Sequence, residues 1–450
     1  MSVIRKLFSA FMNPKTLLAS FALSIAVLAQ GTELRVWTSK DGRQVKASLV
    51  SFDAVAVMLR LADGSDAKVP LEKLSPADQT YLRAQPPGPV AQTSKAVPRK
   101  WPTAVEIQSS AIEVKLVSDA PRRFIYRSEG FEYTSQGKLL PSLMKEVART
   151  FEATKKLVGE LPWGVVCRPP EGLELYQAAL FETRADYIQA GGPSNSSGVY
   201  MSGEKIFKIP FESLGIKRLG KSYTKDENYS SDTLVHEITH QMMHDYLPYM
   251  PKWAIEGSAE YVEMLPYKAG SFGVARHKEG LKDYLETWRV RGRNPLLPKV
   301  SQLFRLKRKE WDETAMIADA QHALYQQSAL LVYYFNHLDG DGSGSRWMKY
   351  MDATKAEADS WVVYEKAFKA YRTAMDEFFK LPGVKKLEGG RFTYPSNLKA
   401  PQPPAAPDGK AYDEDTPLKH LDVLLDGRND EQLQQEISAK FGKAGFRLGS

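Results

Sequence analysis

The segment from Ser230 to Leu265 constrains the fold more than any other part of the chain. It reads SSDTLVHEITHQMMHDYLPYMPKWAIEGSAEYVEML. His236 and His240 would share one face of a helix, because residues four apart are neighbours on an α-helix. Apolar residues would bury the rest of that helix: Leu234, Val235, Ile238 and Met242. Two prolines then end it, which predicts a second helix that folds back against the first.

The first of these predicted helices carries an H-E-x-x-H motif, His236-Glu237-Ile-Thr-His240, in which the two histidines bind zinc. A catalytic zinc ion has three protein ligands and one open position. Glu256 follows His240 by 16 residues, at the start of the second predicted helix, and is the candidate third ligand. Glu260 lies one turn further on the same face, where a carboxylate can accept a hydrogen bond from the other nitrogen of a ligating histidine. The pattern predicts a Zn²⁺ site formed by His236, His240 and Glu256.

The second predicted helix, WAIEGSAEYVE, resembles the W-L-x-E-G-x-A-x-Y segment that follows H-E-x-x-H in gluzincin peptidases. That group includes zinc aminopeptidases and bacterial peptidase-MA-like proteins. Their zinc-binding glutamate precedes the glycine and corresponds to Glu256. The resemblance extends over residues 120–380 and implies an α+β, thermolysin-like catalytic domain. It also implies that Tyr325, in QHALYQQSALLVYYF, stabilises the oxyanion, with His322 as the rival donor.

The resemblance and the motif together predict a zinc metallopeptidase that hydrolyses peptide bonds. Zinc would activate a water molecule, and Glu237 would be the general base that removes its proton. Tyr325 is either the oxyanion donor or a core residue of an apolar helix face. Endopeptidase action is favoured over aminopeptidase action, because no G-x-M-E-N segment precedes His236. The alternative is a non-enzymatic envelope binding protein with a structural metal site, although such a site needs four ligands and no base.

The sequence offers two other residues of metal-binding type, His244 and Cys167. His244 continues the series of histidines, but three histidines along one straight helix span too far to share a zinc ion. Cys167 is the only cysteine in the chain. No intrachain disulfide can form, and a metal must be bound by histidines and carboxylates.

Residues 1–31 have the pattern of a Sec signal peptide. Basic residues precede the apolar run Leu17–Ala29: Arg5, Lys6 and Lys15. The run is shorter than the roughly 18 residues expected of a membrane-spanning helix. The pattern predicts export to the periplasm or the extracellular space, without a membrane span after cleavage. An uncleaved anchor is the alternative.

Residues 32–84 contain short alternating runs separated by Asp-Gly turns, which predict a small β module. The order RVWTS, DGR, LADG and VPLEKLSPADQTYL resembles the SH3-like SHD module of exported bacterial proteins. It implies an SH3-like β-barrel that either binds a protein or cell-envelope partner or serves as a stabilising appendage.

Proline-rich segments at 85–104 and 396–412 predict linkers on either side of a catalytic domain at 105–395. A short helical tail is expected at 413–450. The hydrophobic content of 43% is ordinary for a folded protein. The net charge of +7 comes from scattered Lys and Arg without a recognition motif, so no nucleic-acid partner is expected.

Overall fold

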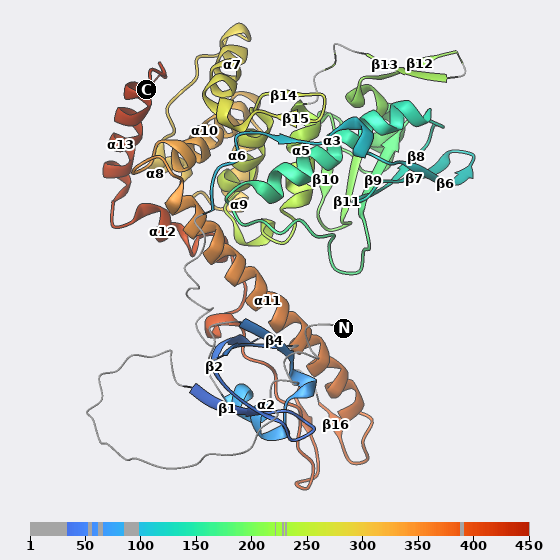
Figure 1. Ribbon diagram of the computed structural model, residues 1–450, viewed down its shortest axis with the longest axis vertical. Coiled ribbons are helices and arrows are strands. Elements are labelled where there is room, and N and C mark those ends of the chain that lie inside the picture. Colours follow the sequence, from blue (N-terminus) through green and yellow to red (C-terminus); the bar gives the residue numbers. More distant parts are fainter. Residues whose placement is uncertain are drawn as a thin grey trace, which may run out of the picture. The chain divides into compact units, whose positions relative to one another are not determined.

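The computed structural model describes residues 34–52, 56–61, 66–84, 99–220, 222–226, 229, 232–387 and 391–449. The chain forms two compact units, Met1–Val97 and Pro98–Ser450, and their boundary falls within the expected linker at 85–104 (Figure 1). Helices and strands are mixed, which confirms the α+β class. The signal peptide expected at 1–31 lies outside the described residues. None of the helices in the described part is long and apolar enough to cross a membrane.

The first unit is a four-stranded antiparallel sheet in chain order, followed by a 3-10 turn, η1 (Leu71–Lys73), and a helix, α2 (Pro76–Ala84). The strands are β1 (Leu34–Thr38), β2 (Gln44–Phe52), β3 (Ala56–Leu61) and β4 (Asp66–Pro70). Its core consists of Trp37, Ala47, Val57, Leu59, Leu74 and Leu82.

The described strands of the first unit form an open sheet and not the closed SH3-like barrel expected at 32–84. β4 ends at Pro70, which has no N–H to donate, and the chain turns into η1. After this turn, an isolated bridge pairs Leu74 with Ser39, directly after β1. The two ends of the sheet are linked by this single bridge among the described residues.

The second unit is built around a six-stranded mixed sheet with the order β10-β11-β9-β8-β7-β6. β11, β9 and β8 are parallel, and the other pairs are antiparallel. The strands are β6 (Lys115–Ala120), β7 (Arg123–Arg127), β8 (Phe131–Ser135), β9 (Tyr176–Phe181), β10 (Val199–Met201) and β11 (Ile206–Pro210). β10 is therefore an edge strand of this sheet.

Helix α3 (Pro141–Glu160) connects the parallel strands β8 and β9 and packs against β8 and α5 (Asp232–Met242). Proline at its first position suits a helix start, because the first N–H has no partner inside the helix. Its apolar residues recur every three or four positions and are buried, including Leu143, Val147 and Phe151. This packing holds α5 against β10 and β11 (Figure 1).

Helix α6 (Lys252–Glu263) follows α5 after a short 3-10 turn, η4 (Leu247–Tyr249). The other elements of this unit are β5 (Val105–Glu106), η2 (Ser109–Ala111), α4 (Arg184–Gln189), η3 (Phe211–Leu214), β12 (Ile216–Leu219), β13 (Ser222–Lys225), β14 (Tyr267–Lys268), β15 (Ser271–Phe272), η5 (Val274–Arg276), α7 (His277–Val290), α8 (Val300–Leu303), α9 (Arg308–Ala315), α10 (Ala318–His337), α11 (Ser345–Phe378), β16 (Lys385–Lys386), β17 (Phe392–Thr393), η7 (Pro407–Gly409), η8 (Thr416–Leu418), α12 (Leu421–Leu425) and α13 (Asp430–Lys443).

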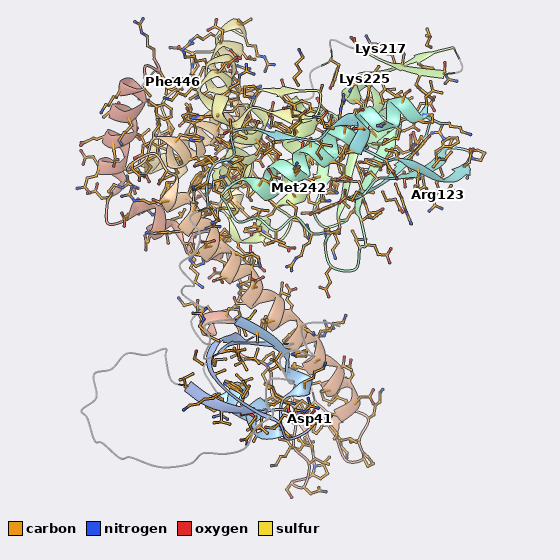
Figure 2. The ribbon with its side chains drawn as sticks, viewed as in Figure 1. Asp41, Arg123, Lys217, Lys225, Met242 and Phe446 are labelled. Carbon is orange, nitrogen blue, oxygen red and sulfur yellow. The ribbon has the colours of Figure 1, made fainter. Side chains whose placement is uncertain are left out.

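The C-terminal segment 413–450, expected as a tail beyond a linker, packs into the main core of the second unit. Its buried apolar residues belong to the same hydrophobic cluster as α5 and α10: Leu421, Leu424, Leu433, Ile437, Phe441 and Phe446. The Phe441 ring stacks on Tyr333 of α10, with centroids 6.3 Å apart. Figure 2 shows Phe446 beside α13 and Met242 of α5 in the interior of the unit.

Candidate metal centre

Helices α5, α6 and α10 carry the candidate site, and α6 packs closely against both of the others. The approach of α6 to α10 depends on Gly257. A Cβ atom at this position would lie 2.4 Å from the carbonyl oxygen of Ser328 and 2.7 Å from a methyl group of Val332. Only glycine allows such a close approach of two helix backbones. Gly257 directly follows Glu256, so this contact fixes where that carboxylate lies.

The structure brings together one donor atom from each of the three predicted ligands. Glu256 Oε2 lies 3.4 Å from His236 Nε2 and 3.2 Å from His240 Nε2. The two Nε2 atoms are 3.1 Å apart. We call these three atoms the donor triangle. All three residues are buried, with 7%, 8% and 5% of their surfaces exposed for His236, His240 and Glu256.

The donor triangle has dimensions that suit a zinc ion. Tetrahedral ligands at about 2.0–2.1 Å from zinc are about 3.3–3.4 Å from one another. One edge of the triangle has this length, and the other two are slightly shorter. Two imidazole nitrogens and a carboxylate oxygen are also a ligand set that zinc accepts. The residues present therefore fit a bound zinc ion.

The orientation of His236 depends on Glu263, which the sequence interpretation did not single out. His236 Nδ1 lies 3.0 Å from Glu263 Oε2 and 3.6 Å from Glu260 Oε1. Glu260 instead accepts a hydrogen bond of 2.7 Å from the hydroxyl of Tyr284. The supporting role predicted for Glu260 therefore belongs mainly to Glu263. Spacing alone could have suggested Glu263, because it lies seven residues after Glu256 on the same helix face.

Lys252 holds the second oxygen of Glu256, with its Nζ atom 3.2 Å from Oε1. This contact leaves Oε2 directed to the histidines. Burial opposes ionisation of Glu256, but the charges of His240 and Lys252 outweigh it and hold the pKa well below its usual range. Burial and the neighbouring Glu263 carboxylate raise the pKa of Glu260 to about 7. The Lys252–Glu256 pair has an i, i+4 spacing that is visible in the sequence.

Glu237, the predicted base, lies beside the donor triangle without contributing to it. Its carboxylate accepts a hydrogen bond of 3.0 Å from the backbone N–H of Tyr200, in the edge strand β10. Burial raises the pKa of Glu237, although the nearby His240 and His236 oppose this shift. A carboxylate with a raised pKa next to a metal site is suited to taking up a proton.

Tyr325 lies beside the donor triangle, whereas its rival His322 does not. The Tyr325 ring is stacked against His236, with centroids 6.3 Å apart. Burial and the carboxylates of Glu256 and Glu237 raise the pKa of Tyr325, so its hydroxyl keeps its proton. His322 bonds through Nδ1 to the carbonyl of Ala318, and its ring lies against Trp288.

His244, the third histidine of the series, is directed away from the donor triangle. Its Nδ1 atom forms a hydrogen bond of 2.8 Å with the hydroxyl of Tyr200. Burial lowers its pKa. His244 therefore serves as an internal comparison for the two histidines of the triangle.

No model of a known protein family matches this chain, and no curated protein matches it either.

Proposed function

We propose that this protein is an exported zinc-dependent peptidase that hydrolyses peptide bonds. The observation that carries the proposal is a donor triangle of zinc-like dimensions with a separate half-buried carboxylate, that of Glu237, beside it. A structural zinc site is filled by four protein ligands, whereas a catalytic one keeps a position open. The triangle offers three ligands, and Glu237 remains available as a base.

When bound, zinc would supply a Lewis acid that polarises the scissile carbonyl and makes water more acidic. Glu237 takes the proton of the attacking water and passes it to the leaving amine. The Tyr325 hydroxyl, which keeps its proton, donates a hydrogen bond to the developing oxyanion. Glu263 and Lys252 hold His236 and Glu256 in the orientations that these steps require.

The family assignment is part of the same proposal. The resemblance of WAIEGSAEYVE to the gluzincin segment supports a thermolysin-like catalytic domain in the second unit. Endopeptidase action is favoured over aminopeptidase action. We also propose that the first unit is an SHD-like module, although its described strands form an open sheet, and that it binds a protein or cell-envelope partner. The sequence pattern of residues 32–84 is the support.

The test is zinc content and cleavage of a mixed peptide library by the purified full-length protein. We expect about one zinc per chain, lost in His240→Ala, and cleavage that Glu237→Gln abolishes while zinc is retained. His244→Ala is the matched control, because it removes a nearby histidine, two residues after the end of α5, that lies outside the triangle. Zinc bound without cleavage by the wild type would favour the alternative, a binding protein with a structural metal. If the wild type held no zinc and His240→Ala behaved like the wild type, both the zinc peptidase and the binding protein with a structural metal would be rejected.

A further inference from the structure

A cavity of about 460 Å³ adjoins the donor triangle on the side of His236. Three of its lining residues belong to the site already described: Glu260, Glu263 and Tyr325. Its other walls come from α7 and Arg291 after it, from residues 264–267, from the start of α10, and from Asp232, the first residue of α5. A pocket that reaches the reacting groups of an enzyme is expected to receive part of the substrate.

The lining of this cavity is acidic in a chain that is basic overall. Four carboxylates face one guanidinium, that of Arg291; the acidic residues are Asp232, Glu260, Glu263 and Asp283. The adjacent cavity that shares Asp232 and Tyr267 is balanced, with three acidic and three basic residues. Another cavity of the second unit has four acidic and three basic residues. The acidic excess is therefore larger in the cavity beside the site than in either of these two, although the whole chain carries a net charge of +7.

The carboxylates differ in their exposure to an entering group. Glu260 is buried and Glu263 is half-buried. Asp232 and Asp283 are exposed, and they lie on different walls, one on α5 and one on α7. These two aspartates are the carboxylates that an entering group would meet.

The same cavity has aromatic walls. Tyr284 and Trp288 of α7 form an edge-to-face pair with centroids 6.1 Å apart. Aromatic rings pack well against the methylene stem of a lysine or arginine side chain, and they attract its charged end. A neutral apolar side chain would gain from the rings but would remove water from the aspartates without replacing it.

We propose that this cavity receives a lysine or arginine side chain of the substrate, close to the bond that is cut, and that Asp232 and Asp283 determine this specificity. The proposal rests on the proposed peptidase function and names its substrate class. The positive charge interacts with the two exposed aspartates, and the stem packs against Tyr284 and Trp288.

The test compares two peptides that differ only in lysine or norleucine at one position, scanned on both sides of the scissile bond. We expect the wild type to prefer lysine at one position by about tenfold in kcat/KM, because opposite charges attract there. Asp283→Asn and Asp232→Asn each reduce the preference severalfold, and Asp283→Lys shifts it towards glutamate. Asp376→Asn, the same change at an exposed position of α11, is the control and leaves it unchanged.

A binding measurement separates failure of this proposal from failure of the proposed function. Glu237→Gln keeps the cavity, and calorimetry with the lysine and norleucine peptides reports binding without cleavage. Equal cleavage and equal binding of the two peptides would overturn the cavity proposal and leave the peptidase function standing. Absence of cleavage by the wild type, with tighter binding of the lysine peptide, would reject the peptidase function and support the cavity as a site for cationic side chains.

Discussion

Replacement of Gly257 by alanine would test whether the close packing of α6 on α10 positions the donor triangle. The added Cβ would lie 2.4 Å from the carbonyl oxygen of Ser328 and 2.7 Å from its carbonyl carbon. Both are backbone atoms of α10 and cannot rotate aside as a flexible side chain could. One helix must therefore move away from the other.

The size of the effect follows from these distances. Even a weak C–H···O contact has a carbon–oxygen distance of about 3.3–3.6 Å, so the helices must separate by roughly 1 Å. Overpacking of this kind costs about 1–3 kcal/mol, while alanine gains up to about 1 kcal/mol over glycine within a helix. We expect a net destabilisation of about 1–2 kcal/mol. Zinc–ligand distances tolerate only about ±0.2 Å, so zinc affinity should fall by at least about tenfold as Glu256 moves with Gly257.

Urea unfolding of the zinc-free protein measures the loss of stability, and competition with a chelator measures the loss of zinc affinity. Gly442→Ala in α13 is the matched control, because nothing lies within 4 Å of its added Cβ. That variant should be unchanged or more stable than the wild type. If Gly257→Ala matched the wild type in both urea midpoint and zinc affinity, the contact with Ser328 would not be what positions Glu256.

Three further predictions concern single side chains. Glu263→Gln should lower zinc affinity by about 10–100-fold, more than Glu260→Gln does, in the same chelator competition; the reverse order would restore Glu260 as the partner of His236. Tyr325→Phe should lower kcat by about 10²–10³-fold with zinc content unchanged, and an unaltered kcat would make Tyr325 a core residue. Burial, with Lys278 nearby, lowers the pKa of His277 to about 4 in the folded protein. As the pH falls from 6.5 towards 4, the His277 imidazole is therefore protonated in the unfolded chain before it is protonated in the folded one. Stability of the zinc-free protein should therefore decrease between pH 6.5 and 4, and urea midpoints of His277→Gln should decrease less over the same interval.

The local parts of the site could be predicted from the sequence because they depend on helix periodicity. The spacing of His236 and His240 determines which face both occupy, and the prolines before Lys252 determine where the second helix begins. The apolar pattern of α3 and its proline start are local in the same way. The structure also places Glu256 next to both histidines, as the antiparallel arrangement of the two helices suggested.

The choice between Glu260 and Glu263 depends on tertiary contacts that the sequence does not display. The two residues lie one turn apart on nearly the same face of α6. The rotation of α6 is set by the contact of Gly257 with α10, and Tyr284 of α7 engages Glu260. The packing of segment 413–450 is also tertiary, because its few apolar residues are buried only when α13 meets α10.

The zinc ion that we propose would also relieve the negative charge that gathers around the donor triangle. Glu256 is engaged by Lys252, but the carboxylates of Glu237, Glu260 and Glu263 add negative charge in a buried region. Burial of like charges is costly, and proteins relieve it by taking up protons or binding cations. Burial raises the pKa of Glu237 and Glu260, so these two carboxylates can relieve the charge by taking up protons. A zinc ion at the donor triangle would relieve the charge as a bound cation, because it would bond to both histidine nitrogens and neutralise the surplus negative charge. Zinc removal should therefore weaken the core of the second unit as well as the proposed chemistry.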